Sequence, residues 1–415
     1  MTNAAPNGRY DIVISGASYA GLALARGLSQ ALEGSARIAL VDTRAVGGTV
    51  PAVDSRAFAL SAGSRRMLSA LGIWDRVADA AQPVSAIEIT DSSLDAGIRP
   101  VLLTYENVVE GGEAASFIVP AGPLGAALAE VVAADAAVDI LAPDEIEAVA
   151  FDAARVNATL RNRGAVTTSL LIAADGRNSP LRTLAGIKSV SRSYPQIGIV
   201  TTVAHDRPHG GRAVQHFLPA GPFAILPLTG NRACITWTEE ADEAKRILAL
   251  DDAGFLDEVD KRFGGRLGRL ALAGPRQSWP LELHLARSYI APRFAVIGDA
   301  AHVVHPIAGQ GLNLALRDVA ALTEAVTDAA RLGLDLGSTQ ALERYERWRR
   351  FDATMSTAAF DGLNVLFSND STLLRAARDV GLGLVDRSPM LKQMFVTEAA
   401  GLTGDVPRLL RGEAV

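Results

Sequence analysis

The sequence is poor in cysteine and in long apolar runs, and each shortage excludes a class of protein. Cys234 is the only cysteine among 415 residues, so there is no intrachain disulfide, no cysteine-rich metal site and no sign of an oxidising compartment. A long uncharged run, Ala213 to Asn231, contains three prolines and cannot be a membrane-spanning helix. Residues 1–9 lack the basic and apolar parts of a signal peptide, so we expect a cytoplasmic protein.

Charge is also scarce, which argues against a nucleic-acid-binding or disordered chain. Charged residues make up 21% of the sequence and apolar residues 49%, with a net charge of −6. This balance is typical of a soluble α/β enzyme with a large core. The negative net charge argues against a general affinity for nucleic acid or anionic lipid. The length predicts about two to three domains, and no internal repeat or low-complexity segment is present.

The N-terminal segment has the pattern of a dinucleotide-binding βαβ unit. Residues 10–15 form an apolar run of buried-strand type, and Gly16-Ala17-Ser18-Tyr19-Ala20-Gly21 leads from it into an expected helix. A second strand, residues 36–41, ends at Asp42. The pattern predicts a pyrophosphate at the helix N-terminus and Asp42 on a ribose hydroxyl. Ser18 replaces the middle glycine and leaves less room for the backbone to approach a phosphate.

Two further strand ends combine an acidic residue with a glycine. Residues 170–174 run into Asp175-Gly176, and residues 294–297 run into Gly298-Asp299. Each strand is a short apolar run, and glycine leaves room for a ligand beside the carboxylate. We therefore expect hydroxyl groups of a ligand to bind Asp299. Asp175 has the same combination of a strand end, a carboxylate and a glycine.

A loop after the last of these strands prepares a second helix N-terminus. Pro306 and the turn Gly309-Gln310-Gly311 interrupt the chain before a helical pattern resumes at Leu312 and Asn313. Free backbone N–H groups at such a terminus favour negative charge.

The middle of the chain alternates as an antiparallel sheet does. Strands are expected at residues 197–203, 213–218, 224–227 and 233–238, followed by an amphipathic helix at residues 251–263. We interpret them as a sheet that covers the cofactor domain and supplies an apolar pocket from Phe217, Phe223, Leu226 and Trp237. Plain sheet core is the alternative interpretation for these aromatic residues.

Several charged or titratable residues allow a functional and a structural interpretation. Arg56 offers a fork of donors for a cofactor phosphate, although an arginine before a helix is often a solvated surface residue. His302 and His305 have no carboxylate or cysteine cluster at ligand spacing beside them, so we predict no metal site and assign both to positioning the loop. The arginine-rich helix expected at residues 340–355 is either a solvated face or a contact with a membrane or partner.

Taken together, these motifs resemble those of the class A flavoprotein aromatic hydroxylases, and among them the ubiquinone-biosynthesis hydroxylases. The closer resemblance lies in Asp54-Ser55-Arg56-Ala57-Phe58-Ala59-Leu60-Ser61 and in the run from Gly298-Asp299-Ala300-Ala301-His302 through His305-Pro306 to Gly309-Gln310-Gly311-Leu312-Asn313-Leu314. Pro120-Ala121-Gly122-Pro123 departs from it, because the family usually has polar residues at this helix start.

The resemblance implies non-covalent FAD with NAD(P)H as a transient reductant. It places Asp42 on the adenosine ribose, Arg56 near the phosphates, Asp299 on the ribityl chain, and Gly309 to Asn313 at the flavin ring. Asp175 and Gly176 would lie near the pyrophosphate and the nicotinamide path. No catalytic base is assigned, and Pro306, Gly309 and Gln310 are expected to position the flavin loop.

The same resemblance implies the reaction. NAD(P)H would reduce FAD, O₂ would add to give a flavin C4a-hydroperoxide, and its distal oxygen would attack a polyprenylated phenol in an apolar, water-excluding pocket. A ubiquinone-biosynthesis complex and a peripheral contact with the inner membrane are the expected settings. The ring carbon attacked, the tail length, the choice between NADH and NADPH, and the oligomeric state stay open.

The expected fold is α/β, with a Rossmann-type FAD-binding domain, an inserted antiparallel-sheet substrate domain and a C-terminal helical region. The FAD-binding domain is expected at residues 8–80, 115–190 and 285–338, and the substrate domain at residues 81–114 and 191–284. Residues 339–415 form the helical region. One alternative is a hydroxylase or reductase of the same fold with another aromatic or lipid substrate. A halogenase would have a tryptophan-rich motif soon after Gly21, which is absent. A second alternative is a non-catalytic FAD-binding assembly protein.

Overall fold

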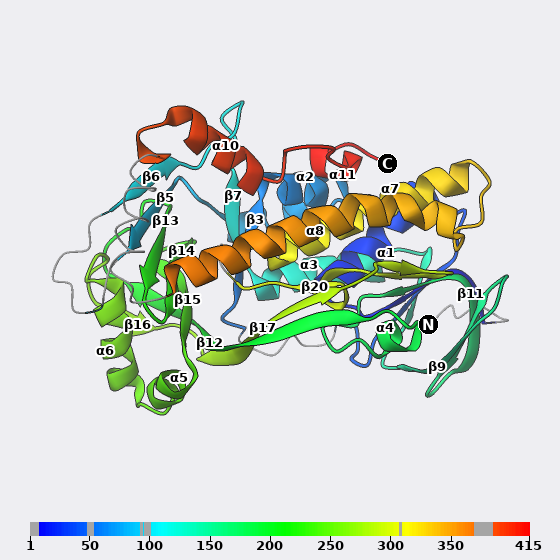
Figure 1. The fold of residues 1–415 in the computed structure, drawn as a ribbon, viewed down its shortest axis with the longest axis horizontal. Coiled ribbons are helices and arrows are strands. Elements are labelled where there is room, and N and C mark those ends of the chain that lie inside the picture. Colours follow the sequence, from blue (N-terminus) through cyan, green and yellow to red (C-terminus); the bar gives the residue numbers. More distant parts are fainter. Residues whose placement is uncertain (1–7, 48–53, 92–93, 95–100, 307–308, 369–384) are drawn as a thin grey trace.

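The computed structural model describes residues 8–47, 54–91, 94, 101–306, 309–368 and 385–415. Figure 1 shows an elongated molecule, with one sheet towards each end and a long helix, α8, running between them. The first sheet has eight strands, six of them in the order β18-β19-β11-β1-β2-β8. These six are β1 (Arg9–Ser15), β2 (Ile38–Val41), β8 (Val138–Leu141), β11 (Gly164–Ala173), β18 (Ile290–Ala291) and β19 (Phe294–Val296).

The central strands of this sheet are parallel and buried on both faces. Ile12, Val13 and Ile14 of β1 have no exposed surface, as expected for continuous apolar runs in a parallel sheet covered on both sides. Ser15 is paired with both Val41 and Ala173, and Ala173 is paired with Val296. The strands β1, β2, β11 and β19 therefore end side by side. Two antiparallel strands, β9 (Ile146–Phe151) and β10 (Val156–Leu160), extend from β11.

Helices pack against this sheet and against one another. Helix α1 (Tyr19–Ala31) packs against α3 (Ala121–Ala133) and α7 (Gly311–Arg331). A methyl group added at Gly27 of α1 would lie 3.0 Å from the Thr323 hydroxyl of α7, so these two helices approach closely. The other helices here are α2 (Ala62–Ala70), α4 (Pro180–Leu184) and α11 (Arg408–Arg411), with the short 3₁₀ turns η1 (Trp74–Arg76), η2 (Ala78–Ala80) and η3 (Gly298–Ala300).

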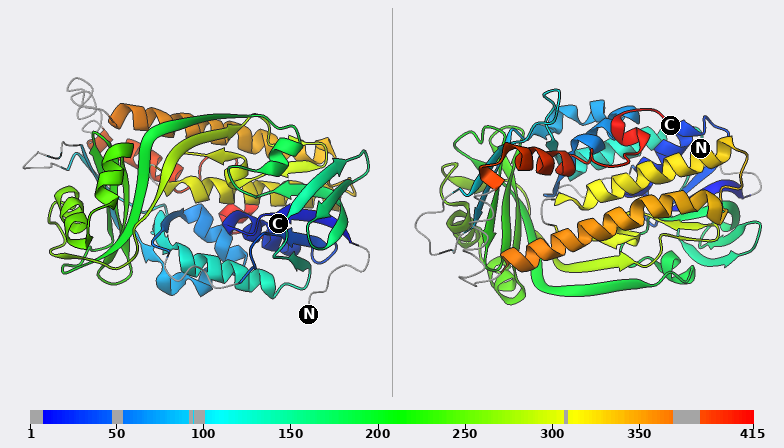
Figure 2. Two further views of the ribbon diagram at one scale, coloured as in Figure 1. Left: turned by 90° about the horizontal axis from the view of Figure 1, so that it is seen from below. Right: turned by 45° about the horizontal axis from the view of Figure 1, so that its top comes forward.

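The second sheet has nine strands, eight of them in the order β20-β17-β12-β15-β14-β13-β5-β6. The predicted middle strands are confirmed, although β13 and β5 run parallel to each other rather than antiparallel. Two helices, α5 (Ala241–Leu248) and α6 (Asp252–Phe263), lie beside this sheet (Figure 2, left). The strands are β5 (Ala86–Asp91), β6 (Leu103–Glu106), β12 (Ser189–His205), β13 (Arg212–Leu218), β14 (Gly221–Leu228), β15 (Arg232–Glu240), β16 (Leu270–Leu272), β17 (Gln277–Ala286) and β20 (His302–Val303).

Three further features join the two sheets. A small sheet is formed by β3 (Ala57–Ser61), β7 (Ser116–Pro120) and β4 (Gln82–Pro83). Strand β20 carries the segment after η3 into the second sheet by pairing with β17. Helix α8 (Thr339–Phe367) contacts β18 of the first sheet and β14 of the second.

Helix α10 (Pro389–Ala399) lies on the same side of the molecule as α8 (Figures 1 and 2). Among the described residues, no helix is both long and apolar enough to cross a membrane.

Candidate functional site

The three strand-end motifs and Asp42 meet at one edge of the first sheet. The fingerprint turn follows β1, Asp42 follows β2, Asp175 follows shortly after β11, and Gly298-Asp299 follows β19. Because these strands are neighbours and parallel, their carboxyl ends lie together. Ligands of open α/β sheets bind at this edge. The site is therefore assembled from segments that are far apart in the sequence.

The fingerprint turn needs glycine at both of its ends. Gly16 has φ +107°, and a methyl group there would overlap the Ala174 carbonyl. A methyl group at Gly21 would overlap the Gly16 carbonyl. Both positions bring backbone into closer contact than any side chain allows. The turn is therefore held in one conformation at the start of α1.

The N-terminus of α1 is open to an anion. Ser18 is the N-cap residue, with an extended backbone (φ −86°, ψ −169°), and its side chain makes no capping hydrogen bond. The first turn of α1 contains no acidic residue. The first N–H groups of a helix have no intrahelical acceptor, and the helix dipole favours negative charge there. A pyrophosphate fits this terminus, and the serine in place of the middle glycine does not block it.

Asp42 lies beside that turn at the end of β2. Its carboxylate accepts hydrogen bonds from the backbone N–H groups of Ala17 (2.6 Å) and Arg44 (2.8 Å). These bonds fix the carboxylate next to the fingerprint, where a ribose hydroxyl would bind it.

Arg56 is already paired within its own segment. Its Nε and Nη2 atoms donate to the two oxygens of Asp54, at 3.0 and 2.6 Å. The hydrogen bond to Asp54 and the field of Asp299 both raise the pKa of Arg56, while burial opposes them. The guanidinium is therefore a permanent charge near Asp299, with part of its donor fork taken by Asp54.

Asp299 is accessible although its neighbours are buried. It lies in η3 between Gly298 and Ala300, which are both buried, while Asp299 itself is exposed. Desolvation by the surrounding protein raises the pKa of Asp299, and His302, Arg177 and Arg56 oppose the rise. A carboxylate that is reachable but surrounded by protein on most sides suits a ligand hydroxyl.

Asp175 is the second acidic strand end, and its carboxylate is buried at the start of the turn before α4, where Ser179 and Leu181 N–H partly offset the effect of burial on its pKa. Neither oxygen is accessible or has a hydrogen-bond partner among the described residues, and burial raises the pKa of Asp175. Gly176 follows with φ +86°. Buried polar atoms without partners are rare in proteins and often mark a ligand or functional position.

Arg182, which no motif of the sequence singles out, connects two of the strand-end motifs. It donates from Nη1 to the Ala300 carbonyl (2.8 Å) and from Nη2 to the Arg177 carbonyl (3.0 Å). Burial lowers the pKa of Arg182, and the nearby Asp175 opposes this. It thereby holds the segment after β11 against η3.

A buried ionic network centred on Asp318 holds η3 against helices α7 and α8. Asp318 of α7 accepts hydrogen bonds from Gly298 N (2.9 Å) and Arg349 Nε (2.7 Å), and its carboxylate pairs with His302 Nε2 at 2.6 Å. Burial alone would raise the pKa of Asp318, but His302 and Arg349 hold it below its usual value. Arg349 belongs to α8 and also pairs with Asp352. No local sequence signal joins these residues, because α7, α8 and β20 meet only in the folded chain.

The loop before α7 is only partly described, since residues 307 and 308 of the predicted Pro306–Asn313 loop lie outside the described residues. Gly309 N donates to the Pro306 carbonyl (3.1 Å), and a methyl group at Gly309 would lie 3.2 Å from the Ala59 side chain. At Gly311, the first residue of α7, nothing lies within 4 Å of an added methyl group. This helix N-terminus therefore has free space beside it, as binding of a flavin would require.

The side chain of Asn313 holds the protein together rather than facing a ligand. It accepts from Ser61 N (3.0 Å) and Ser64 Oγ (2.8 Å) and donates to the Ala59 carbonyl (2.8 Å). It also donates to Gln310 Oε1 (3.2 Å). The part of Asn313 left for a flavin is its backbone. Gln310 and Leu312 lie beside it at the start of α7.

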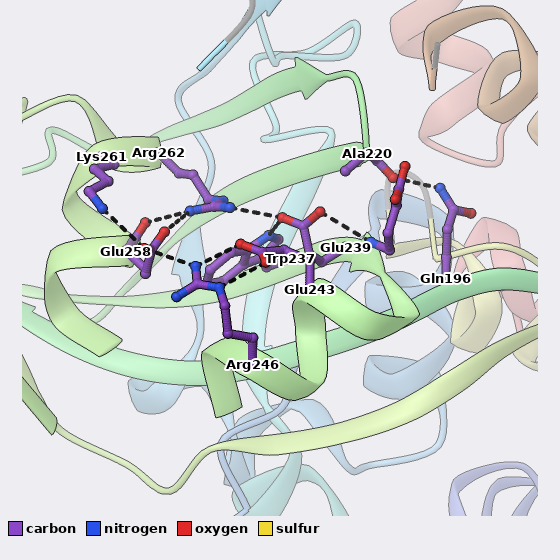
Figure 3. Close-up of polar contacts among 10 residues, drawn as sticks. Gln196, Ala220, Trp237, Glu239, Glu243, Arg246, Glu258, Lys261 and Arg262 are labelled. Carbon is purple, nitrogen blue, oxygen red and sulfur yellow. Dashed lines mark hydrogen bonds and ion pairs between the residues drawn. The ribbon is translucent and has the colours of Figure 1, made fainter. Parts of the chain in front are cut away.

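Two of the four predicted pocket residues, Phe223 and Trp237, lie on the face of the second sheet that packs against α6. The prediction that these two residues line the substrate pocket is therefore wrong. Both are buried in a cluster with Phe255 of α6. Figure 3 shows the polar contacts here: Trp237 Nε1 donates to Glu239 (3.2 Å), and Arg262 bridges Glu239 and Glu258. The Arg262 guanidinium lies 4.2 Å from the Trp237 ring centre. Trp237 is therefore core between the sheet and the helices.

The other two predicted pocket residues lie on the opposite face of the same sheet. Leu226 packs against a cluster that also contacts Ala57 and Ala59 of β3. Phe217 stacks on Phe367 at the end of α8, with ring centres 4.0 Å apart. Side chains alternate between the faces of a strand, so a run of apolar residues divides between two surfaces. Apolarity alone did not indicate the face.

The geometry fits a dinucleotide whose diphosphate lies at α1 and whose ring end lies towards α7. The uncapped α1 terminus, the required glycines and the accessible Asp299 are independent observations in favour of such a ligand. Among the described residues, no group of three or more His, Cys, Asp or Glu side chains could hold a metal ion.

Comparisons with known proteins agree with this geometry. The family model described as FAD binding domain matches residues 9–358. The ubiquinone hydroxylase UbiL of Rhodospirillum rubrum is 41% identical over 362 residues, which cover 86% of this chain and 83% of that protein. The 3-demethoxyubiquinol 3-hydroxylase of Escherichia coli is 32% identical over 94% of this chain and 98% of its own.

A solved structure agrees at the level of the fold. The p-nitrophenol 4-monooxygenase PnpA from Pseudomonas putida superposes with a TM-score of 0.77 at 17% identity. The match covers 96% of this chain and 99% of that one. The expected fold class is thereby confirmed.

Proposed function

The chain belongs to the FAD binding domain family, and from this membership and its similarity to ubiquinone-biosynthesis hydroxylases we propose that it hydroxylates the aromatic ring of a polyprenylated phenol in ubiquinone biosynthesis. It is an FAD-dependent aromatic-ring monooxygenase that uses NAD(P)H and O₂. The observation that carries the proposal is the meeting of four strand ends with predicted cofactor-binding residues at one sheet edge, in a chain 41% identical to a ubiquinone hydroxylase over 362 residues.

The cofactor contacts are part of the proposal. The N–H groups at the start of α1 hold the pyrophosphate of FAD, and Asp42 binds the adenosine ribose. Asp299 binds the ribityl hydroxyls, and Arg56 supplies positive charge near the phosphates. The backbone at the start of α7 faces the flavin ring. When bound, FAD would supply the redox chemistry of the reaction, which is acceptance of a hydride from NAD(P)H and activation of O₂.

The protein itself must bind the phenol and exclude water. We assign this task to the face of the second sheet that carries Phe217 and Leu226, opposite the loop at Pro306. An apolar wall limits the loss of a reactive oxygen species to water. The prenyl tail would leave along the end of α8, where Phe367 stacks on Phe217.

Two helices would meet a membrane that supplies so apolar a substrate. Phe351 and Met355 of α8, and Met390, Met394 and Phe395 of α10, are large apolar residues with more than half of their surface exposed. Both helices lie on one side of the molecule (Figure 2, right). The exposed Arg347, Arg350 and Arg387 would meet anionic head groups. We therefore propose peripheral contact with the inner membrane from the cytoplasmic side.

We propose that the chain is divided into the three regions that the sequence predicts. Residues 8–80, 115–190 and 285–338 would bind FAD, residues 81–114 and 191–284 would bind substrate, and residues 339–415 would carry the membrane contact. Of these ranges, residues 48–53, 92–93, 95–100, 307–308 and 369–384 lie outside the described residues.

One set of measurements tests the function. The purified protein should show a flavin absorbance spectrum and should oxidise NADPH or NADH faster when a short-chain prenylphenol is added. Mass spectrometry should find a product heavier by one oxygen atom. Bound flavin with no hydroxylated prenylphenol would count against this substrate and favour another aromatic or lipid substrate. A protein that cannot be loaded with FAD would contradict the proposal altogether.

A further inference from the structure

The two histidines before the flavin loop differ in their surroundings. His302 is paired with the buried Asp318 of α7. His305, which directly precedes Pro306, is 1% exposed, and neither ring nitrogen has a hydrogen-bond partner among the described residues. The loop-positioning role expected for both histidines therefore agrees with the contacts of His302 but leaves the nitrogens of His305 unexplained.

Such an arrangement is costly unless another molecule completes it. Burying a polar group without a hydrogen bond lowers stability, so proteins generally satisfy buried nitrogens. Burial lowers the pKa of His305 to about 4, and the field of Asp361 opposes this only in part. The imidazole is therefore neutral at pH 7, with one N–H donor and one acceptor nitrogen.

The polar neighbours of His305 are bonded to one another. The Tyr194 ring meets the imidazole edge to face, with centres 5.2 Å apart. Its hydroxyl donates to Asp361 of α8 (2.7 Å), and Asp361 also pairs with Arg192. The polar atoms of these groups are bonded to one another, and both imidazole nitrogens are left without a partner among the described residues.

We propose that His305 binds the phenolic hydroxyl of the substrate, with its unprotonated nitrogen accepting the O–H hydrogen bond. The inference rests on the proposed function and adds a residue in direct contact with the substrate. His305 directly precedes Pro306, and its ring contacts Tyr194 of β12, so it lies where the flavin loop meets the second sheet. On the proposed function, the aromatic ring of the substrate binds between these two parts. A hydrogen bond from the phenol to a neutral nitrogen increases electron density in the ring, which favours attack by an electrophilic oxygen.

The test compares a phenol with its methyl ether, which cannot donate this hydrogen bond. A short-chain prenylphenol and its methyl ether are titrated into the FAD-loaded protein, and binding is followed by quenching of flavin fluorescence. Wild type should bind the phenol roughly tenfold tighter than the ether, as expected for a buried hydrogen bond. The H305F variant should bind both within about twofold of each other, and H305N should retain part of the preference.

A second buried histidine supplies the matched control. His205 lies at the far end of β12, and its Nδ1 contacts the Arg207 carbonyl at 2.8 Å. The H205F variant should keep the wild-type ratio of the two affinities. If H305F does not fold, ¹⁵N NMR of the six histidines in wild type gives the answer. The phenol and not the ether should then shift one imidazole signal, the one that is missing in H305N.

The outcomes separate this inference from the proposed function. If wild type hydroxylates the prenylphenol but H305F keeps the full preference for the phenol, the role of His305 is wrong and the function stands. An imidazole signal that responds equally to phenol and ether would also overturn it. If wild type binds neither compound, the proposed function fails, and the role of His305 fails with it.

Discussion

At the scale of single residues, the cofactor edge depends on backbone geometry more than on side-chain chemistry. Gly16 and Gly21 are adjacent in space, and neither position has room for a side chain. Ser18, between them in the sequence, is tolerated because its side chain takes no part in capping α1. The substitution at the middle of the fingerprint is therefore harmless, whereas one at either end would not be.

We predict that Gly21→Ala lowers the affinity for FAD by roughly 5- to 140-fold, because overpacking of this kind costs about 1–3 kcal/mol. The added methyl group would displace the turn that holds the pyrophosphate. Flavin release during dilution of the purified protein measures the effect. Gly362→Ala is the control, since nothing lies within 4 Å of a methyl group there. Equal flavin retention in both variants would contradict this account of the turn.

At the scale of elements, Asp318 of α7 joins its own helix to three other parts of the fold. It connects α7 to η3, β20 and α8 through a backbone N–H, a histidine and an arginine. A buried charge that loses one partner is strongly destabilising, because the remaining charges cannot return to water. The network therefore transmits any weakening of α8 to the turn that carries Asp299.

We predict that Asp318→Asn lowers the free energy of unfolding by about 3–5 kcal/mol, as measured by urea denaturation. Flavin affinity should fall as well, because η3 loses its support. Glu147→Gln breaks an exposed pair with Arg161 and should cost less than about 1 kcal/mol. A change as small as that of the control would show that the network does not hold the three elements together.

Acid should weaken the attachment of α6 to the second sheet. Burial alone would raise the pKa of Glu258, but hydrogen bonds from Arg262, Lys261 and Arg246 lower it to about 2. A carboxylate whose pKa is lowered by folding adds stability above its unfolded pKa of about 4.5, and this stability is lost as the pH falls towards 2.

We predict that Glu258→Gln lowers the thermal midpoint at pH 7 and that the difference from wild type narrows as the pH falls from about 4.5. Thermal unfolding at several pH values measures both effects. Asp242→Asn, in a fully solvated pair with Lys245, should change the midpoint little at any pH. A difference for Glu258→Gln that stays constant from pH 7 to pH 3 would disprove the assignment.

At the scale of the whole molecule, many of the exposed large apolar residues of this acidic chain belong to two helices, α8 and α10, that lie on one side. The net charge is −6, yet the exposed Arg347 and Arg350 belong to α8, and the exposed Arg387 shortly precedes α10 in the sequence. A large exposed apolar surface with flanking arginines is typical of proteins that bind membrane surfaces. This side also carries the end of α8 that stacks on Phe217.

We predict that the triple variant Phe351→Ser, Met390→Ser and Phe395→Ser binds vesicles more than about tenfold more weakly, since each buried apolar side chain contributes about 1.5–3 kcal/mol. Sedimentation with vesicles of phosphatidylethanolamine and phosphatidylglycerol measures binding. Leu332→Ser is the control, because Leu332 is 75% exposed at the far end of α7. Hydroxylation of a short-chain phenol should be unchanged in the triple variant. Equal sedimentation of all three proteins would contradict a membrane role for this side.

The sequence by itself determined the features that depend on a few consecutive residues. Apolar runs ending in Gly16, Asp42, Asp175 or Asp299 specify strand ends locally, because the residues that form the turn are adjacent in the chain. The helix at residues 251–263 and the four middle strands were predicted for the same reason. Together with the long motif around Pro306, these signals were sufficient for the fold class and the cofactor.

Only the tertiary structure decided which distant segments meet and which face of a strand points where. The order of the parallel strands brings Asp175 and Asp299 to one edge, and the pairing of Asp318 with Arg349 joins helices that share no local signal. Phe223 and Phe217 are equally apolar in sequence, yet they occupy opposite faces of the sheet. Likewise, His302 and His305 differ only in what surrounds them. Burial and pairing are properties of the assembled chain, so they cannot be read from neighbours in the sequence.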